Sequence, residues 1–211
     1  MAIKSFSVQA SNSEDAIKEF KNKLGDFSPV FIIFFASSVY EKTNPAKALR
    51  ESFPNCEIIG STSHSEYCNN EFKEDSISLM AMDKESIADV CVKVVENIDK
   101  GGDYVTPIEE THAYFGGYDN ILNNFDKYIG IVIFEGSAKS EEYGMDTIGT
   151  HTDIMYVGGT SSEKEGTSRV YANGKSYEKA TVLATLKTTK GYDVIKTQSA
   201  HAFSDKAITV T

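Results

Sequence analysis

A largely apolar run without polar alternation occurs twice in this chain, at residues 30–37 (VFIIFFAS) and at residues 128–137 (YIGIVIFEGS), where it ends before Glu135. Neither run alternates with polar residues as a half-exposed strand would, so each predicts a strand that is covered on both faces. Such a strand is stable only where other elements pack on both of its sides. This double requirement constrains the fold more than any other feature of the sequence.

The segments that follow the two runs match one another in order. Strands are predicted in matched pairs at 57–63 and 155–162, at 76–82 and 180–186, and at 88–95 and 192–198. Matched positions lie about 98 residues apart at Gly60 and Gly158. They lie about 104 residues apart at Val90 and Val194. We therefore predict two similar halves, about 1–98 and 108–211, joined by a glycine- and proline-containing segment at 99–107.

Helices are predicted before and within each half. The periodicity favours helices at about 12–25, from Pro45 onward, at about 111–125 and at about 141–149. These helices suffice to cover one face of each sheet, so the other face must be buried against the other half. The predicted fold is an α/β sandwich of mixed sheets with layers in the order helix, sheet, sheet, helix. A hairpin turning at Asn173-Gly174 is expected as an insertion in the second half only.

The charge balance argues against two classes of partner. The net charge is -10, and no cluster of basic residues is longer than a pair, so neither nucleic acid nor an anionic membrane is an expected partner. The longest apolar run is far shorter than the roughly 20 residues that a membrane-spanning helix needs. The three cysteines show neither a disulfide nor a zinc-binding spacing, and no secretory signal is evident. We expect a cytoplasmic protein without a metal site.

Short segments rich in glycine, serine and threonine follow the predicted buried strands. The carboxyl ends of central strands are the usual ligand edge of open α/β sheets. Glycine lets the backbone approach a ligand, and hydroxyl groups supply hydrogen bonds without a full charge. We therefore predict a small-molecule site in which Glu66 or Arg169 meets a charged end of the ligand. The remaining predicted ligand-binding residues are Ser61, Thr62, Ser63, Gly159, Thr160 and Ser161.

Three local motifs point to a known family. Residues 60–67 read GSTSHSEY, residues 158–163 read GGTSSE, and residues 169–175 place an Asn-Gly turn between two strands. Their order and separation resemble the N-terminal region of the FIST sensory family (F-box and intracellular signal transduction proteins), from about residue 28 onward. The sequence departs from the family pattern at His64, Ser65 and Glu163, where the family has alanine, glycine and aspartate.

This resemblance implies one FIST N-like domain over residues 1–211 that senses a small polar molecule, such as an amino acid, inside the cell. It also implies a partner, either a downstream signalling protein or a C-terminal FIST domain. Some members are linked to haem and nitric oxide sensing, for which His64 is the candidate ligand in the motif loop. A ligand-free interaction scaffold is the other alternative.

No enzyme activity is expected, because the sequence lacks the common nucleophile, dinucleotide and zinc-protease motifs. Glu66 could in principle serve as an acid or base beside Thr62 or Ser63, but no activating base is visible. We therefore interpret Glu66 as a cap of local backbone N–H groups or as a partner for a ligand's ammonium group. No resident cofactor is predicted in the main interpretation.

Overall fold

The computed structural model describes residues 2–162 and 168–196. Its strands are β1 (Ile3–Val8), β2 (Phe31–Ser37), β3 (Glu57–Ser63), β4 (Glu66–Cys68), β5 (Glu71–Lys73), β6 (Ile77–Met82), β7 (Ile87–Glu96), β8 (Tyr128–Phe134), β9 (Met155–Thr160), β10 (Val170–Ala172), β11 (Lys175–Tyr177) and β12 (Ala180–Thr188). Its α-helices are α1 (Ser13–Leu24), α2 (Pro45–Ser52), α3 (Val105–Tyr114), α4 (Tyr118–Leu122) and α5 (Glu141–His151).

The described strands form two large sheets and one separate hairpin. The first sheet has the order β1-β6-β2-β3-β10-β11, and the second has the order β7-β12-β8-β9. In each sheet the apolar strand predicted to be central, β2 or β8, pairs in parallel with the next long strand, β3 or β9. Its other neighbour, β6 or β12, is antiparallel. Both sheets are therefore mixed, as the sequence predicted.

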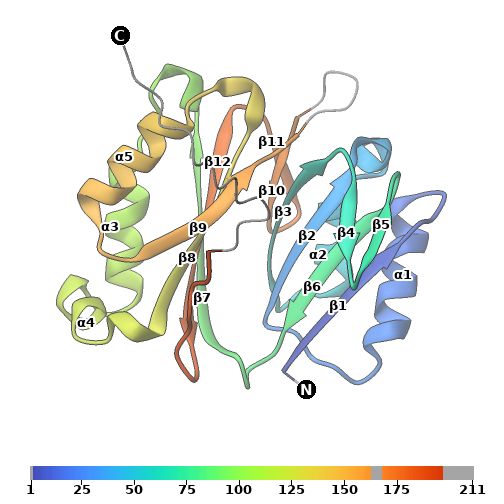
Figure 1. The fold of residues 1–211 in the computed structure, drawn as a ribbon, viewed down its shortest axis with the longest axis horizontal. Coiled ribbons are helices and arrows are strands. Elements are labelled where there is room, and N and C mark those ends of the chain that lie inside the picture. The colour runs from blue at the N-terminus through green and yellow to red at the C-terminus, as the bar shows by residue number, and fades with distance from the viewer. Residues whose placement is uncertain (1, 163–167, 197–211) are drawn as a thin grey trace, which may run out of the picture.

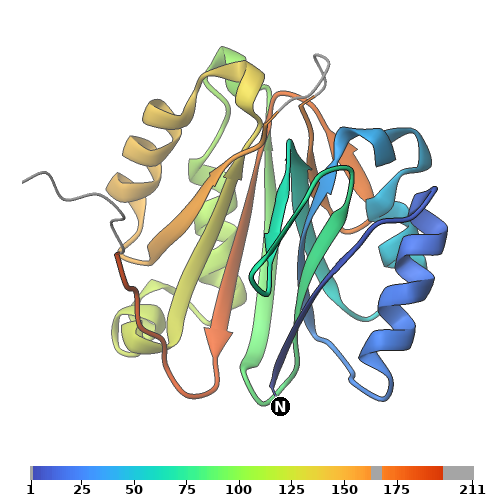
Figure 2. The same ribbon diagram turned by 45° about the vertical axis from the view of Figure 1, so that its right-hand side comes forward.

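The two sheets pack face to face, with helices on their outer faces (Figures 1 and 2). Helices α1 and α2 cover the first sheet around a core that includes Phe20, Phe34 and Leu49. Helices α3 and α5 cover the second sheet. A separate apolar cluster, which includes Phe31 and Val182, fills the space between the sheets. The helix-sheet-sheet-helix sandwich predicted from the apolar runs is confirmed.

The chain crosses from the first sheet to the second between β6 and β7, at residues 83–86. The sequence placed this crossing later, at 99–107, but β7 pairs with β12 and so belongs to the second sheet. Strand β7 is thus the counterpart of β1, not of residues 192–198. Residues 191–196 form no strand, and residues 197–198 lie outside the described part of the chain.

The hairpin at Asn173-Gly174 is not an insertion, because the first half has a hairpin at the equivalent place. Strands β4 and β5 turn at Asn69-Asn70, where both residues have positive φ, as in the turn of β10 and β11. The two hairpins pair over the same length, and their positions differ by 104 residues. The offset therefore changes between β9 and β10, in the longer segment 161–169, and not in the hairpin.

The helix expected at 111–125 is broken into two. Helix α3 ends at Tyr114, and Gly116 and Gly117 then adopt positive φ, a conformation that L-residues with side chains rarely take. Helix α4 follows. Nearer the N-terminus, α1 has Asn12 as its N-cap, because the Asn12 side chain accepts a hydrogen bond from the Asp15 backbone N–H.

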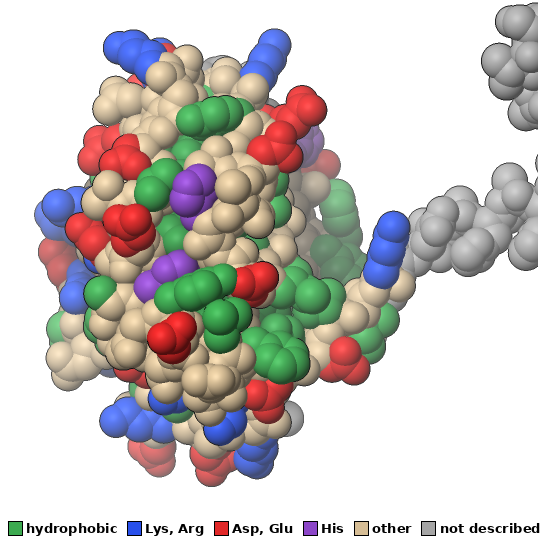
Figure 3. Space-filling model, turned by 90° about the vertical axis from the view of Figure 1, so that its left-hand side faces the viewer, with side chains coloured by type: hydrophobic (Ala, Val, Ile, Leu, Met, Phe, Trp, Pro, Cys, Tyr) green, Lys and Arg blue, Asp and Glu red, His purple; other side chains and the backbone are tan. Residues whose placement is uncertain are grey.

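The outer face of the second helix layer carries apolar side chains interspersed with acidic ones (Figure 3). The exposed large apolar residues on its helices are Tyr114, Tyr118, Leu122, Tyr143 and Met145. Helices α1 and α2 expose no side chain of this kind. Within residues 2–162 and 168–196, no helix combines the length and apolar character needed to cross a membrane.

Candidate functional site

A cavity of about 270 Å³ lies between the two sheets, where β2, β3, β8 and β9 approach their carboxyl ends. Its walls are largely apolar. It is lined by Ile33, Phe35, Ser61, Ile131, Ile133, Gly158, Gly159 and Thr160. Phe35 is 40% exposed, and Gly158, Gly159 and Thr160 are also exposed, so the cavity opens to solvent.

The lining is built from equivalent positions of the two halves. The strand pairs β2-β3 and β8-β9 have the same register when positions are shifted by 98 residues, which places Phe34 opposite Gly60 and Val132 opposite Gly158. With this shift, Ile33 corresponds to Ile131, and Ser61 corresponds to Gly159. The cavity therefore lies at the pseudo-symmetric centre of the sandwich.

Ser61 is the polar group best placed to meet a ligand in this cavity. Its side chain makes no hydrogen bond with any residue in the described ranges, whereas the Thr160 hydroxyl donates to Glu141 at 3.2 Å. Gly159 has open space where a side chain would be, because a Cβ there would meet no atom within 4 Å. Of the eight residues predicted to bind a ligand, Ser61, Gly159 and Thr160 line the cavity.

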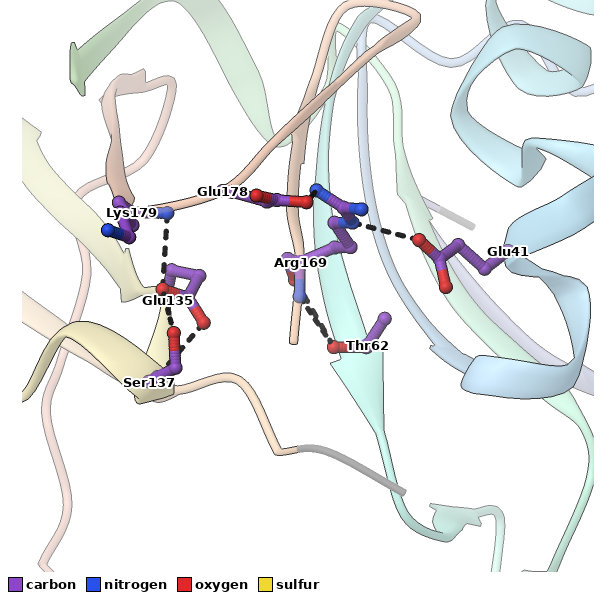
Figure 4. A network of polar contacts seen from close by, with 7 residues as sticks. All are labelled: Glu41, Thr62, Glu135, Ser137, Arg169, Glu178 and Lys179. Carbon is purple, nitrogen blue, oxygen red and sulfur yellow. Dashed lines mark hydrogen bonds and ion pairs between the residues drawn. The ribbon is translucent and has the colours of Figure 1, made fainter. Parts of the chain in front are cut away.

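Thr62 and Arg169 do not line the cavity, and they join β3 to the segment before β10 (Figure 4). The Thr62 hydroxyl accepts a hydrogen bond from the Arg169 backbone N–H at 2.9 Å. The Arg169 guanidinium forms ion pairs with Glu41, at 2.8 Å, and with Glu178. These two carboxylates raise its pKa, although partial burial acts in the opposite direction. Arg169 is thus engaged by two acids of its own chain.

Ser63 and Glu66 form a buried network at the start of β4. Glu66 is 2% exposed and accepts hydrogen bonds from the hydroxyls of Ser63, at 2.5 Å, and Ser76, at 2.6 Å. Burial raises the pKa of the Glu66 carboxyl, and these hydrogen bonds only partly offset that effect. These hydrogen bonds connect β4 to the end of β3 and to the residue before β6.

The second half also has a buried carboxylate, directly after β8. Glu135 follows β8, is 1% exposed, and accepts hydrogen bonds from the backbone N–H groups of Ser137, at 2.9 Å, and Lys179, at 3.1 Å (Figure 4). Burial alone would raise its pKa, but the donated hydrogen bonds outweigh burial, and the pKa of Glu135 lies below its ordinary value. Nearby, Ser161 bonds with Ser168 and accepts from the Gly136 backbone N–H.

The candidate haem ligand lies outside the cavity. His64 is exposed in the turn between β3 and β4. None of the cavity-lining residues is a His, Cys, Met or Tyr, the residue types that ligate haem iron. The described residues therefore do not form a haem site in this cavity. His201, another histidine of the sequence, lies outside the described residues, as does Glu163 of the second motif.

Sequence reasoning missed the apolar part of the lining. Ile33, Phe35, Ile131 and Ile133 were assigned to the core because they lie in the apolar runs. A signal was available, since residues two apart on a strand share a face, and Ser61 therefore lies on the same face of β3 as the buried Ile59.

A larger depression of about 720 Å³ lies at the amino end of β2, between the end of α1 and the turn at 83–85. It is lined by charged side chains, including Lys4 and Asp83, and it involves only one half of the sandwich. The carboxyl-end cavity agrees better with the usual ligand edge of α/β sheets.

A family model, the FIST N domain, matches residues 30–211. No curated protein matches the chain significantly.

Proposed function

The chain belongs to the FIST N domain family, a family of signal-transduction sensory domains, and from this we propose that it is an intracellular sensor whose ligand binds between the two sheets. The observation that carries the proposal is the cavity at the centre of the pseudo-symmetric sandwich, with largely apolar walls and the Ser61 hydroxyl, which has no hydrogen-bond partner in residues 2–162 and 168–196. Small-molecule sites commonly combine apolar walls with a few placed polar groups.

The lining favours a ligand with a small apolar body and one hydrogen-bonding end. Among the residues that the structure describes, no charged side chain lines the cavity, and Arg169 is paired with Glu41 and Glu178. A charged group of the ligand must therefore stay at the open, solvated side, because an unpaired charge is costly to bury. An amino acid with an apolar side chain fits this description, with the side chain between the sheets. We propose binding without catalysis.

The test is a thermal-unfolding screen of the intact chain against apolar amino acids and other small metabolites. A ligand that binds only the folded protein raises the melting temperature, by the equivalent of about 2.7 kcal/mol at a concentration about 100 times the Kd. We expect Gly159→Val to abolish the shift, because the new side chain occupies the cavity without a backbone clash. Ser61→Ala should weaken binding by removing one hydrogen bond.

The matched control is Gly149→Val. Gly149 lies on α5, and a Cβ there also meets no atom within 4 Å, but the position is remote from the cavity lining. This variant should retain the full ligand-induced shift. Absence of any stabilising compound in a broad panel, or an undiminished shift in Gly159→Val, would contradict the proposal.

A further inference from the structure

The two edges of the sandwich are closed to different degrees. On one side, β3 pairs antiparallel with β10, so the hairpin of the second half extends the sheet of the first half. On the other side, β9 is the last strand of its sheet, and no described strand pairs with its outer edge. By the pseudo-symmetry, the hairpin that corresponds to β10-β11 is β4-β5.

The β4-β5 hairpin already lies against the same surroundings as its counterpart. Strand β4 contacts β6 and β1, just as β10 contacts β12 and β7, and these neighbours are themselves equivalent. The pairing with the edge of the neighbouring sheet, however, is absent. Free sheet edges usually carry charges, prolines or bulges that prevent pairing. Strand β9 (MYVGGT) has neither a charge nor a proline.

The residues that make the closed edge have counterparts at the open one. Tyr171 lies opposite Gly60, is 1% exposed and stacks on Phe34 with ring centroids 5.3 Å apart. The counterparts of this pair are Tyr67, which is 70% exposed, and Gly158. An aromatic side chain opposite a glycine is a pairing that specifically favours adjacent strands, because the ring covers the bare backbone.

The turn residues agree with this correspondence. At the closed edge, the Asn173 side chain accepts a hydrogen bond from the Ile58 backbone N–H at 2.9 Å. Its counterpart, Asn69, instead exchanges hydrogen bonds with Ser5 of β1, at 2.9 and 3.0 Å. Asn69 therefore has the right side chain for the same contact with β9, but it is used elsewhere in this conformation.

We propose that the open edge closes by antiparallel pairing of β4 with β9, in the register that places Tyr67 opposite Gly158 and Cys68 opposite Val157. This register follows from the pairing of β10 with β3 when each β3 residue is replaced by the β9 residue 98 positions later, and each β10 residue by the β4 residue 104 positions earlier. Closure brings the rim of the central cavity together, because Gly158 and Gly159 belong to both the edge and the lining. It gives a sensory domain a second conformation, and it stands whatever molecule the cavity binds.

A disulfide trap tests this register with a cysteine that the protein already has. Cys68 is free and partly exposed, whereas Cys56 and Cys91 are buried. At the closed edge, the Thr62 N–H donates to the Arg169 carbonyl and the Asn173 N–H donates to the Ile58 carbonyl. Hydrogen-bonded pairs alternate along an antiparallel ladder, so the intervening pair of Ile59 and Ala172 is a non-hydrogen-bonded pair. The corresponding pair, Cys68 and Val157→Cys, would have its Cα atoms about 4.5 Å apart, within the range for a disulfide.

The intact Val157→Cys variant is incubated with oxidised glutathione, and the disulfide is quantified by mass spectrometry of the unreduced protein. Two thiols lose two electrons and two protons, and one glutathione disulfide becomes two glutathione thiols. The controls are Met155→Cys, which is exposed on the same face of β9 but two residues out of register, and Val157→Cys with Cys68→Ser. Both target side chains are substantially exposed, so neither change should prevent folding.

We expect the Cys68 to Val157→Cys disulfide to form several-fold faster than the Cys68 to Met155→Cys disulfide, and to be absent in the double variant. The disulfide should also slow hydrogen exchange at the Tyr67 and Gly158 amides, which become hydrogen-bonded on closure. Equal rates at positions 157 and 155, or a disulfide without protection of these amides, would overturn the inference. Either result leaves the ligand screen unaffected, so failure of closure and failure of ligand binding are distinguishable.

Discussion

The two halves of the molecule share the order of their main strands and helices, but they differ in whether the outer edge of β3 or β9 is paired with another strand. In the first half, β3 is covered by a hairpin from the second half, and Tyr171 is buried there. In the second half, β9 has no such cover among the described strands, and the equivalent Tyr67 is largely exposed. One pattern of sequence can therefore support both a closed and an open edge, because edge pairing depends on contacts from a different part of the chain.

The helix layers also differ, and again the second half is the more exposed. The helices of the first half expose no large apolar residue, whereas α3, α4 and α5 expose several (Figure 3). The second half is thus the one with incomplete cover on its outer face and at its edge. Elements that move on ligand binding are drawn from the less stable parts of a protein.

The largest expected difference between the halves is in the stability of variants that lack one of the two equivalent tyrosines. Tyr171→Ala is expected to lower the free energy of unfolding by about 3–5 kcal/mol, because it leaves a cavity in a packed core. Tyr67→Ala should change it by no more than about 0.5 kcal/mol, because most of that side chain is already in water. Urea denaturation monitored by circular dichroism measures both values. Similar losses in the two variants would show that Tyr67 is already buried in solution, as closure of the edge requires.

The two buried carboxylates should also respond unequally. Glu135→Gln is expected to cost about 1–3 kcal/mol of unfolding free energy, because hydrogen bonds from Ser137 and Lys179 to the ionised group are lost. Glu66→Gln should cost less, because removing the charge also removes its cost of burial. The same denaturation experiment compares them near pH 7. A greater loss of unfolding free energy in Glu66→Gln than in Glu135→Gln would contradict this prediction. It would mean that the hydrogen bonds of Glu66 contribute more to stability than burial of its charge costs.

The smallest effect is a difference in pH dependence. The pKa of Glu66 is raised in the folded protein, so the wild type should gain stability relative to Glu66→Gln as the pH falls from the raised value toward the ordinary carboxyl pKa of 4.5. The gain is limited to about 1.4 kcal/mol per pH unit, the value for a single proton.

Glu135 provides the contrast in the same measurement. Its pKa is lowered, so its stabilising effect is present above the ordinary carboxyl pKa and is lost only as the pH falls below that value, through the lowered pKa. We therefore expect the difference in unfolding free energy between wild type and Glu66→Gln to change between about pH 5 and pH 7. The corresponding difference between wild type and Glu135→Gln should stay constant over this range. Denaturation curves measured at several pH values test both expectations. The opposite pattern would contradict the assigned pKa directions.

Part of the candidate site followed from the sequence. The polar segments at the carboxyl ends of β3 and β9 do meet at one cavity, and Ser61, Gly159 and Thr160 line it. Thr62 and Ser63 do not, since Thr62 lies on the opposite face of its strand from Ser61 and Ser63 bonds with Glu66. Glu66 and Arg169 also make contacts within the protein that local sequence does not reveal, because their partners lie on other elements.

The sequence by itself determined the apolar strands, their repetition and the layered α/β class, because hydrophobic periodicity is a local property that burial then enforces. Tertiary structure alone decided which sheet β7 joins, which strand each hairpin borders and which hydroxyl remains free in the cavity. Those features depend on pairing between segments far apart in the chain, and several pairings are compatible with the same local pattern. The open edge at β9 shows the consequence, because its sequence matches the closed edge while its neighbours differ.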